Sequence, residues 1–569
     1  MIQRLFAYGN RTGWLVLAVL VLLILLPLAA VIVQVLLPGV FFGNWELGDL
    51  SLLLEIFRRP LWYQSLKNTL TLGIGTTVFA TVLGGALATV RAQWKFPAAK
   101  LLDVTVWLLI ITPSFILAQG WVMFAASNGL ARQWFGWDWM HSVVFTPAGL
   151  IAIMSLSKFP FAYLAVFTAL EWKVDRLGEA ARLNGGGPWT TWRTIQLPLL
   201  LPAYCSGAML VFMDTVGDFG LPASIAAVFR FPTLPYSIYS ALYTSPIRFD
   251  MAGVLSFYLV LLIALAMSVQ FYVLRKSRFD FLNARATRTE PMPLRSGWSK
   301  WAIAAASALL VAMAAGIPFG SNLMTSITRS NGASGATLTG EHYRKLFENG
   351  GRLAGGLAHS LEIAAGAALV GLTVGFFVSY VLTYSRFALR QTVDVISLIS
   401  LAVPGVVLGI GYIFIWNQAW LEKIGLLLYG KPAILILASV AGAIPVITRV
   451  LTGAMAKVPA GLLSAAQMQG AGFGRRLATI IVPLLRGALV SAAMAAFGAS
   501  VFDLATTSIL FPPNFMTLPV VINKAFEDLK FGYAAAATLT GGGIVIAAIM
   551  LIEWALRPKK SNRARSNRI

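Results

Sequence analysis

Residues 171–198 read EWKVDRLGEAARLNGGGPWTTWRTIQLP and separate two long apolar runs. The first part of this segment has the composition of a short helix, and the glycines at 185–187 permit a sharp reversal of the chain. A second helix is expected from Pro188, and Pro198 opens the next apolar run. Adjacent alanines at 180–181 leave a shallow helix surface that another protein can approach closely. The sequence therefore predicts a polar helix-turn-helix between two membrane spans.

A second segment of the same design, SAAQMQGAGFGRRLATIIVP, lies at 464–483. Other residues pair between the halves in the same order, namely Asp103 with Asp394, Pro113 with Pro404 and Asp218 with Asp503. Since each copy holds an even number of spans, both copies enter the membrane from the same side and form a parallel repeat. We expect a first half at 1–285 with its loop at 171–198, a linker at 286–300, and a second half at 301–569 with its loop at 456–483.

The composition places the chain in a bilayer. Of its 569 residues, 58% are apolar and only 12% are charged, which is more apolar surface than a soluble core hides. Runs of roughly 20 apolar residues are long enough to cross the hydrocarbon layer. The sequence predicts an all-α integral membrane protein with about twelve spans, near 14–37, 67–90, 101–126, 147–170, 199–216, 251–274, 301–319, 359–383, 392–416, 432–455, 484–502 and 533–556.

The placement of the basic residues predicts the orientation. With the N-terminus inside, most of the 44 Lys and Arg residues fall in internal segments. The positive-inside rule then places both termini in the cytoplasm of a multi-pass plasma membrane protein. The apolar run at 14–37 is too long for a typical signal peptide and is interpreted as an uncleaved span. The basic linker and the basic C-terminal tail are expected to contact lipid headgroups rather than nucleic acid.

The loop at 171–198 resembles the signature of binding-protein-dependent ABC importer permeases, which is Glu-Ala-Ala, three residues, Gly, nine residues and Ile-x-Leu-Pro. The second copy departs from it by having serine for the glutamate and valine for the leucine. The resemblance implies a bacterial inner membrane permease with an external solute-binding protein. It also implies that each loop docks one of two copies of an ATPase subunit. The residues that match or replace the motif are Glu179, Ala180, Ala181, Gly185, Ile195 and Pro198 in the first loop, and Ser464, Ala465, Ala466, Gly470, Ile480 and Pro483 in the second.

The sequence holds no motif for ATP hydrolysis or metal catalysis. The string GLLLYGKP at 425–432 has the glycine spacing of a phosphate-binding loop, but Pro432 replaces the hydroxyl that would hold magnesium. One cysteine, Cys205, and three scattered histidines do not form a metal site. We therefore expect no catalytic residues, no metal and no cofactor in this chain, with ATP and magnesium bound by the partner subunits.

Carboxylates near membrane depth are candidates for the substrate pathway because such groups are costly there. Asp214 and Asp218 follow the fifth span and Asp503 follows the eleventh. Two interpretations stay open, in which these residues flank the external mouth or cap external helices. Pro113 and Pro404 interrupt matching spans and indicate either broken helices around a central pathway or kinks filled by neighbouring helices.

The substrate is indicated only by the resemblance. Fused permeases with a string like Asp218-Phe219-Gly220 look like those for ferric iron and are similar to relatives for thiamine, phosphonates or polyamines. Oxygen ligands suit Fe(III), although no dedicated ligand set is evident. A secondary carrier or channel would share the twelve spans and the repeat, and a membrane enzyme would need a polar catalytic cluster. The duplicated loop argues against a carrier or channel, and the sequence contains no such catalytic cluster.

Overall fold

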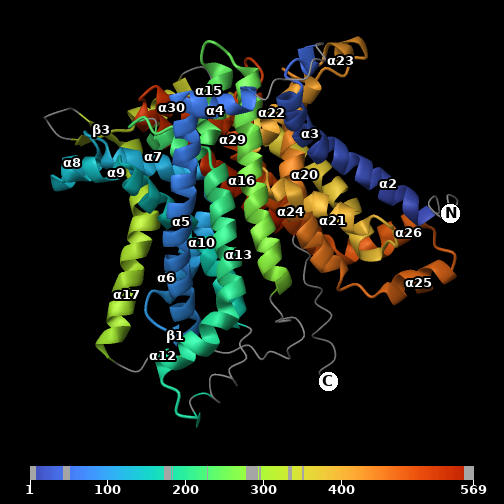
Figure 1. The fold of residues 1–569 in the computed structure, drawn as a ribbon, viewed down its shortest axis with the longest axis horizontal. Helices are drawn as coiled ribbons and strands as arrows, with labels where there is room; N and C mark the ends of the chain where they lie inside the picture. The colour runs from blue at the N-terminus through green and yellow to red at the C-terminus, as the bar shows by residue number, and fades with distance from the viewer. Residues whose placement is uncertain are drawn as a thin grey trace. The chain divides into compact units, whose positions relative to one another are not determined.

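The computed structural model describes residues 8–42, 51–171, 181, 183–226, 228–276, 292–293, 297–330, 336–348 and 352–556. These residues are almost entirely helical, with two short pairs of strands (Figure 1). Strands β1 (Trp94–Lys95) and β2 (Met292–Pro293) pair in parallel, and β3 (Thr328–Ser330) and β4 (Ala336–Leu338) pair antiparallel. The predicted all-α class is confirmed.

The helices of the first half follow one another along the chain, and the longest connection between two of them separates α10 from α12. They are α2 (Tyr8–Leu20), η1 (Val21–Leu25), α3 (Leu26–Leu36), η2 (Val40–Phe42), α4 (Ser51–Arg58), α5 (Pro60–Gln93), α6 (Ala99–Ile111), α7 (Ser114–Ala125), α8 (Leu130–Phe135), α9 (Trp139–Val144), α10 (Pro147–Glu171), α12 (Pro188–Thr191), η3 (Trp192–Gln196), α13 (Leu197–Gly217), α14 (Gly220–Ala226), α15 (Leu234–Tyr243) and α16 (Phe249–Lys276).

The second half repeats this order, including π-helical turns at the same points of its first and fifth spans. Its helices are α17 (Trp298–Val311), η4 (Ala312–Gly316), α18 (Ile317–Ile327), α19 (Glu341–Glu348), α20 (Arg352–Tyr384), α21 (Arg390–Ala402), α22 (Gly405–Trp416), α23 (Ala419–Lys423), α24 (Pro432–Met455), α25 (Ala460–Met468), α26 (Phe473–Arg476), η6 (Leu477–Ile481), α27 (Val482–Leu484), α28 (Arg486–Val501), α29 (Leu504–Leu510), α30 (Leu518–Glu527) and α31 (Phe531–Leu556).

Two of the predicted spans are sharply bent at proline. Proline cannot donate to the preceding turn and pushes the residue before it out of helical geometry. Accordingly Thr112 and Val403 are extended, with ψ of 125° and 121°. The pair α6 and α7 is bent by 109° and the pair α21 and α22 by 111°. The broken-helix interpretation of Pro113 and Pro404 therefore describes the backbone at both positions.

The number of helices that can cross a membrane agrees with the prediction. In the described part of the chain, nine helices are long and apolar enough to span, and counting each of three bent pairs as one span gives twelve. The third bent pair is 473–484 with 486–501, bent by 77°, and its first member lies almost entirely within the predicted loop at 456–483.

The chain folds into two compact units that do not coincide with the halves of the sequence. One unit contains Met1–Val33, Lys345–Lys524 and Ala537–Ile569, and the other contains Gln34–Arg344 and Ala525–Ala536. The first spanning helix of each half therefore packs with the other half. The predicted boundaries at 285 and 301 divide the chain into its two sequence repeats and not into these spatial units. As domain boundaries they stay a prediction.

This exchange is made in the same way in both units. A Cβ atom added to Gly120 of α7 would collide with the backbone of Pro318 in α18, and one added to Gly411 of α22 would collide with the backbone of Pro27 in α3. Gly120 aligns with Gly411, and Pro27 aligns with Pro318. Each broken span thus lies directly against the backbone of an exchanged helix, and only glycine permits that approach.

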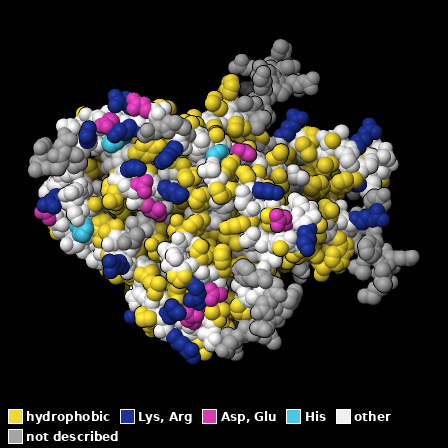
Figure 2. All heavy atoms as spheres, turned by 90° about the horizontal axis from the view of Figure 1, so that it is seen from above, with side chains coloured by type: hydrophobic (Ala, Val, Ile, Leu, Met, Phe, Trp, Pro, Cys, Tyr) yellow, Lys and Arg dark blue, Asp and Glu magenta, His cyan; other side chains and the backbone are white. Residues whose placement is uncertain are grey.

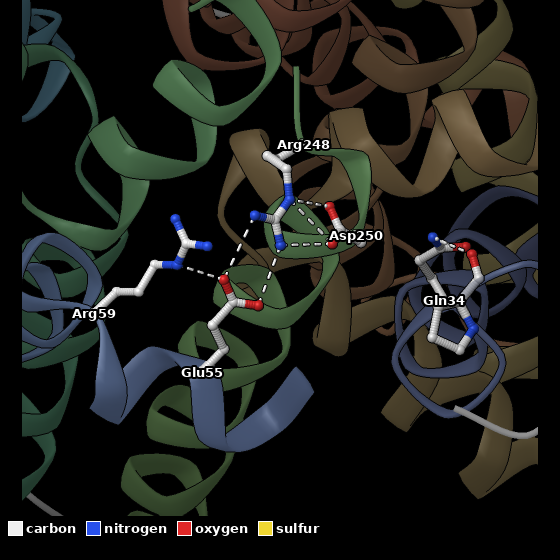
Figure 3. A network of polar contacts seen from close by, with 6 residues as sticks. Gln34, Glu55, Arg59, Arg248 and Asp250 are labelled. Carbon is white, nitrogen blue, oxygen red and sulfur yellow. Dashed lines mark hydrogen bonds and ion pairs between the residues drawn. The ribbon is translucent and has the colours of Figure 1, made fainter. Parts of the chain in front are cut away.

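Within the unit Gln34–Arg344, helices α5, α10 and α13 pack side by side, with α12 at one end and α4 and α15 at the other (Figure 1). At the α4 end, Glu55 lies between two guanidinium groups (Figure 3). Its carboxylate contacts Arg59 Nε at 2.7 Å and Arg248 Nη2 at 3.2 Å, and Arg248 also contacts Asp250 Oδ2 at 2.8 Å. This network joins α4 to the start of α16.

Figure 2 looks onto the ends of the helices at the top of Figure 1. The described Lys, Arg, Asp and Glu side chains of this face stand in small groups of both signs between apolar side chains.

Candidate functional site

The two predicted docking loops reverse the chain in the same way. Gly185 and Gly470 both have φ of +81°, a left-handed conformation that costs little only for glycine. The amide of Gly186 donates to Ala181 O at 2.8 Å, and the amide of Ala471 donates to Ala466 O at 3.0 Å. These are the backbone bonds of a Schellman ending, which closes a helix with glycine.

The remaining predicted loop residues occupy matching places. Ile195 and Ile480 lie in the π-helical turns η3 and η6, and Pro198 and Pro483 lie in the helical turns that follow. Ser464 and Ala465 are exposed residues of α25. Glu179 and Ala180 lie outside the described residues, so the acidic position of the motif has no structural description.

Large apolar side chains project from both loops. Leu183 is 88% exposed in the first loop, and its counterpart Met468 is 84% exposed in the second. Trp189 is also exposed and stacks on Trp192 with 5.1 Å between ring centroids. Leu183 and Met468 thus occupy equivalent exposed positions beside the two turns.

At the far end of α13, the two predicted carboxylates of the first half share one lysine. Lys158 Nζ of α10 lies 2.5 Å from Asp214 Oδ2 and 2.8 Å from Asp218 Oδ2. The Lys158 residue is 7% exposed, and the Asp218 side chain is 4% exposed. We call Lys158, Asp214 and Asp218 the ionic cluster.

Asp218 also accepts two hydrogen bonds from uncharged donors. Its Oδ1 accepts from Ser114 Oγ at 2.7 Å and from the amide of Leu221 at 3.3 Å. Ser114 directly follows the bend at Pro113, and Leu221 lies in the first turn of α14. The structure therefore brings Asp218 next to the Pro113 bend, two features that the sequence predicted separately.

Lys158 is a site residue that was not predicted from the sequence. The available signal was a lysine inside an apolar span, which is costly unless a partner neutralises it. The partner was not readable because α13 follows α10 only after the long loop at 172–196, and the register between two helices is a tertiary property.

The second half retains only one part of this arrangement. Asp503 Oδ1 accepts the amide of Thr506 at 3.0 Å and so caps α29. Ala443 and Ala499 align with Lys158 and Asp214. Burial raises the pKa of the Asp503 carboxyl above its ordinary value, and the bond from Thr506 opposes that shift. Of the two interpretations of the carboxylates, Asp503 fits the helix cap.

A pair of substitutions at Asp503 tests this cap. We expect Asp503→Asn to keep the acceptor for Thr506 and to change the stability of the purified protein by less than about 0.5 kcal/mol. Asp503→Ala removes the acceptor and should cost about 1 kcal/mol. Thermal unfolding in detergent, followed by intrinsic fluorescence, measures both. Equal melting temperatures for the two variants would contradict the capping role.

The chain matches the family model described as binding-protein-dependent transport system inner membrane component, twice, over residues 80–279 and 371–557. It is 23% identical over 497 residues to the ferric transport system permease protein FbpB of Actinobacillus pleuropneumoniae, which covers 86% of this chain and 70% of that protein. It is also 23% identical over 482 residues to the putative ferric transport system permease protein FbpB 1 of Haemophilus influenzae, covering 83% and 73%.

A shorter relative matches one portion of the chain. The molybdenum transport system permease protein ModB of Escherichia coli is 29% identical over 193 residues, which is 33% of this chain and 81% of that protein. Two matches to one family model, a repeated helix order and two equivalent loops agree on one assignment. The chain belongs to the inner membrane components of binding-protein-dependent transport systems, as a double-length permease of the ABC importer class.

Proposed function

We propose that this permease imports ferric iron, taking it from an external binding protein and releasing it into the cytoplasm. The observation that carries the proposal is the similarity to two ferric transport permeases along 86% and 83% of this chain, which includes both halves. Thiamine, phosphonates and polyamines are the alternatives within the same class.

ATP hydrolysis is proposed to occur on a separate subunit, present in two copies, with one copy on each loop. The matched turns at Gly185 and Gly470 and the exposed side chains of Leu183 and Met468 support this arrangement. Both termini are then cytoplasmic, on the side of the loops, and the basic linker and tail contact lipid headgroups. The proposed contact residues are Glu179, Ala180, Ala181, Gly185, Ile195, Pro198, Ser464, Ala465, Ala466, Gly470, Ile480 and Pro483.

Purification and reconstitution test this proposal together. Mild detergent extraction should recover two ATPase subunits per permease chain. In proteoliposomes, radioactive Fe(III) loaded on the binding protein should accumulate only when ATP is present on the loop side. Uptake of molybdate or sulfate instead of iron would contradict ferric iron as the substrate. The assignment to the ABC importers would still hold. Uptake driven by an ion gradient, without a co-purifying ATPase, would overturn the coupling mechanism.

A further inference from the structure

Helices α10 and α13 are the two arms of the first docking loop. Helix α10 ends at Glu171, where the loop begins, and η3 leads from α12 into α13 without a break. A displacement of the loop is therefore applied to both helices at the same end. At a rise of about 1.5 Å per residue, Lys158 and Asp214 lie about 20–25 Å along these helices from the loop.

The ionic cluster ties the two arms together at that distance. Lys158 of α10 contacts Asp214 of α13 and Asp218 just beyond its end. The Lys158 and Asp218 side chains are buried, so water screens their attraction little. The arms are thus joined at the loop and again at the cluster, which resists sliding of one helix along the other.

Asp218 extends this connection to the bent span. Its bond from Ser114 reaches the first residue of α7, and its bond from the Leu221 amide reaches α14. Gly220 permits the approach, since a Cβ atom there would lie 2.8 Å from Ser114 Oγ. Both arms and the two helix breaks, between α6 and α7 and between α13 and α14, are therefore linked by hydrogen bonds and ion pairs.

The second half has the same order of helices, but its fifth span is bent by 77° between 473–484 and 486–501, and it lacks these polar connections. Ala443 and Ala499 replace the lysine and the first aspartate, and Gly405 replaces Ser114. A Cβ atom on Gly405 would lie 2.6 Å from Thr506 Oγ1, so α22 meets α29 by close packing. Arms held only by apolar packing slide past each other more easily than arms joined by a buried ion pair.

We propose that Lys158 is a positioning residue that makes the first half a stiff arm, so that the loop at 171–198 and helix α7 move as one body when the ATPase closes. The second half yields between its loop and α22. This inference rests on the proposed docking of an ATPase at the loops. It assigns to the first half the transmission of force to the Pro113 bend.

Distances between pairs of spin labels test this inference independently of the substrate. One pair is Leu183→Cys with Trp134→Cys, and the equivalent pair of the second half is Met468→Cys with Trp420→Cys, all four native side chains being exposed. The labels are placed in a Cys205→Ser background with the ATPase bound. Adding a non-hydrolysable ATP analogue should leave the first distance unchanged within about 2 Å and shift or broaden the second.

The variant K158A/D214A gives the first half the alanines of the second at these two positions and keeps the hydrogen bonds that Asp218 accepts from Ser114 and Leu221. In this variant we expect the ATP analogue to broaden the distribution of distances between the labels at 134 and 183. Uptake per ATP hydrolysed should fall at least fivefold while the ATPase stays bound. Ser114→Ala removes only the hydrogen bond to α7 and should lower uptake per ATP hydrolysed about twofold. This variant tests the stiff arm if K158A/D214A does not assemble. Asp214→Asn is the control, because it keeps the Lys158 pair with Asp218.

The outcomes separate the two proposals. If no ATPase co-purifies with the unmodified chain, the proposed function fails. If the ATPase binds and the first-half distance of K158A/D214A stays as narrow as in the unmodified chain, the stiff arm is overturned and the proposed function stands. Equal analogue-induced shifts in both halves of the unmodified chain would also overturn it.

Discussion

The Gly185→Val variant is expected to insert into the membrane normally and to lose transport. Gly185 has φ of +81°, and a β-branched residue in that region costs about 1–3 kcal/mol. No atom lies within 4 Å of a Cβ added there, so the cost arises from the backbone and not from crowding. We expect the turn to relax by moving Leu183 and Trp189 out of the proposed ATPase-docking surface. Uptake and ATPase co-purification measure the loss.

The chain offers a matched control two residues away. Gly187 also has open space around an added Cβ atom and does not have a left-handed φ. Gly187→Val should therefore transport as the unmodified chain does. In the second loop, Gly470→Val and Gly472→Val form the same comparison, because Gly472 has φ of −63°. If Gly185→Val and Gly187→Val behaved alike, the shape of the turn would be irrelevant to coupling.

The Gly120→Ala variant is expected to fail in assembly rather than in coupling. The added methyl group would overlap the carbonyl oxygen and Cα of Pro318, which are backbone atoms without rotamer freedom. Overpacking typically costs 1–3 kcal/mol, and we expect at least about 3 kcal/mol here because two backbones must separate. Gly411→Ala should act in the same way against Pro27. The measurement is the monodisperse fraction in size-exclusion chromatography and its melting temperature.

Gly442→Ala is the control for this prediction. Gly442 lies inside α24, and nothing lies within 4 Å of a Cβ atom added there. Alanine favours a helix over glycine by roughly 0.5–1 kcal/mol, so this variant should be at least as stable as the unmodified chain. If Gly120→Ala had the same melting temperature as Gly442→Ala, the close approach of α7 and α18 would not contribute to stability.

Features that recur along the chain could be predicted from the sequence. The turn glycines, the paired prolines and the apolar runs act locally, so the loops, the bent spans and the all-α fold followed from them. Features that depend on which helices touch could not be predicted. The ion pairs of Lys158 and the exchange of the first spanning helices bring together residues far apart in sequence, and apolar composition is the same for every partner in a bilayer.

The membership of the family also decides between the classes of function that the sequence left open. Twelve spans and a parallel repeat are shared with secondary carriers. The double match to inner membrane components of binding-protein-dependent systems assigns the chain to the importers. Because Ser464 stands where the first loop has a glutamate, we predict that the two loops make unequal contacts with the proposed ATPase subunits.

The exchange of first helices has a consequence for biogenesis. Helix α7 emerges early, but Pro318, against which Gly120 rests, is synthesised about 200 residues later, a delay on the order of 10–40 s at 5–20 residues per second. During that interval the surface of α7 must be shielded by lipid or by an insertion factor. The first half cannot mature before translation has entered the second, and two fragments split at the linker should become stable only when both are made in the same cell.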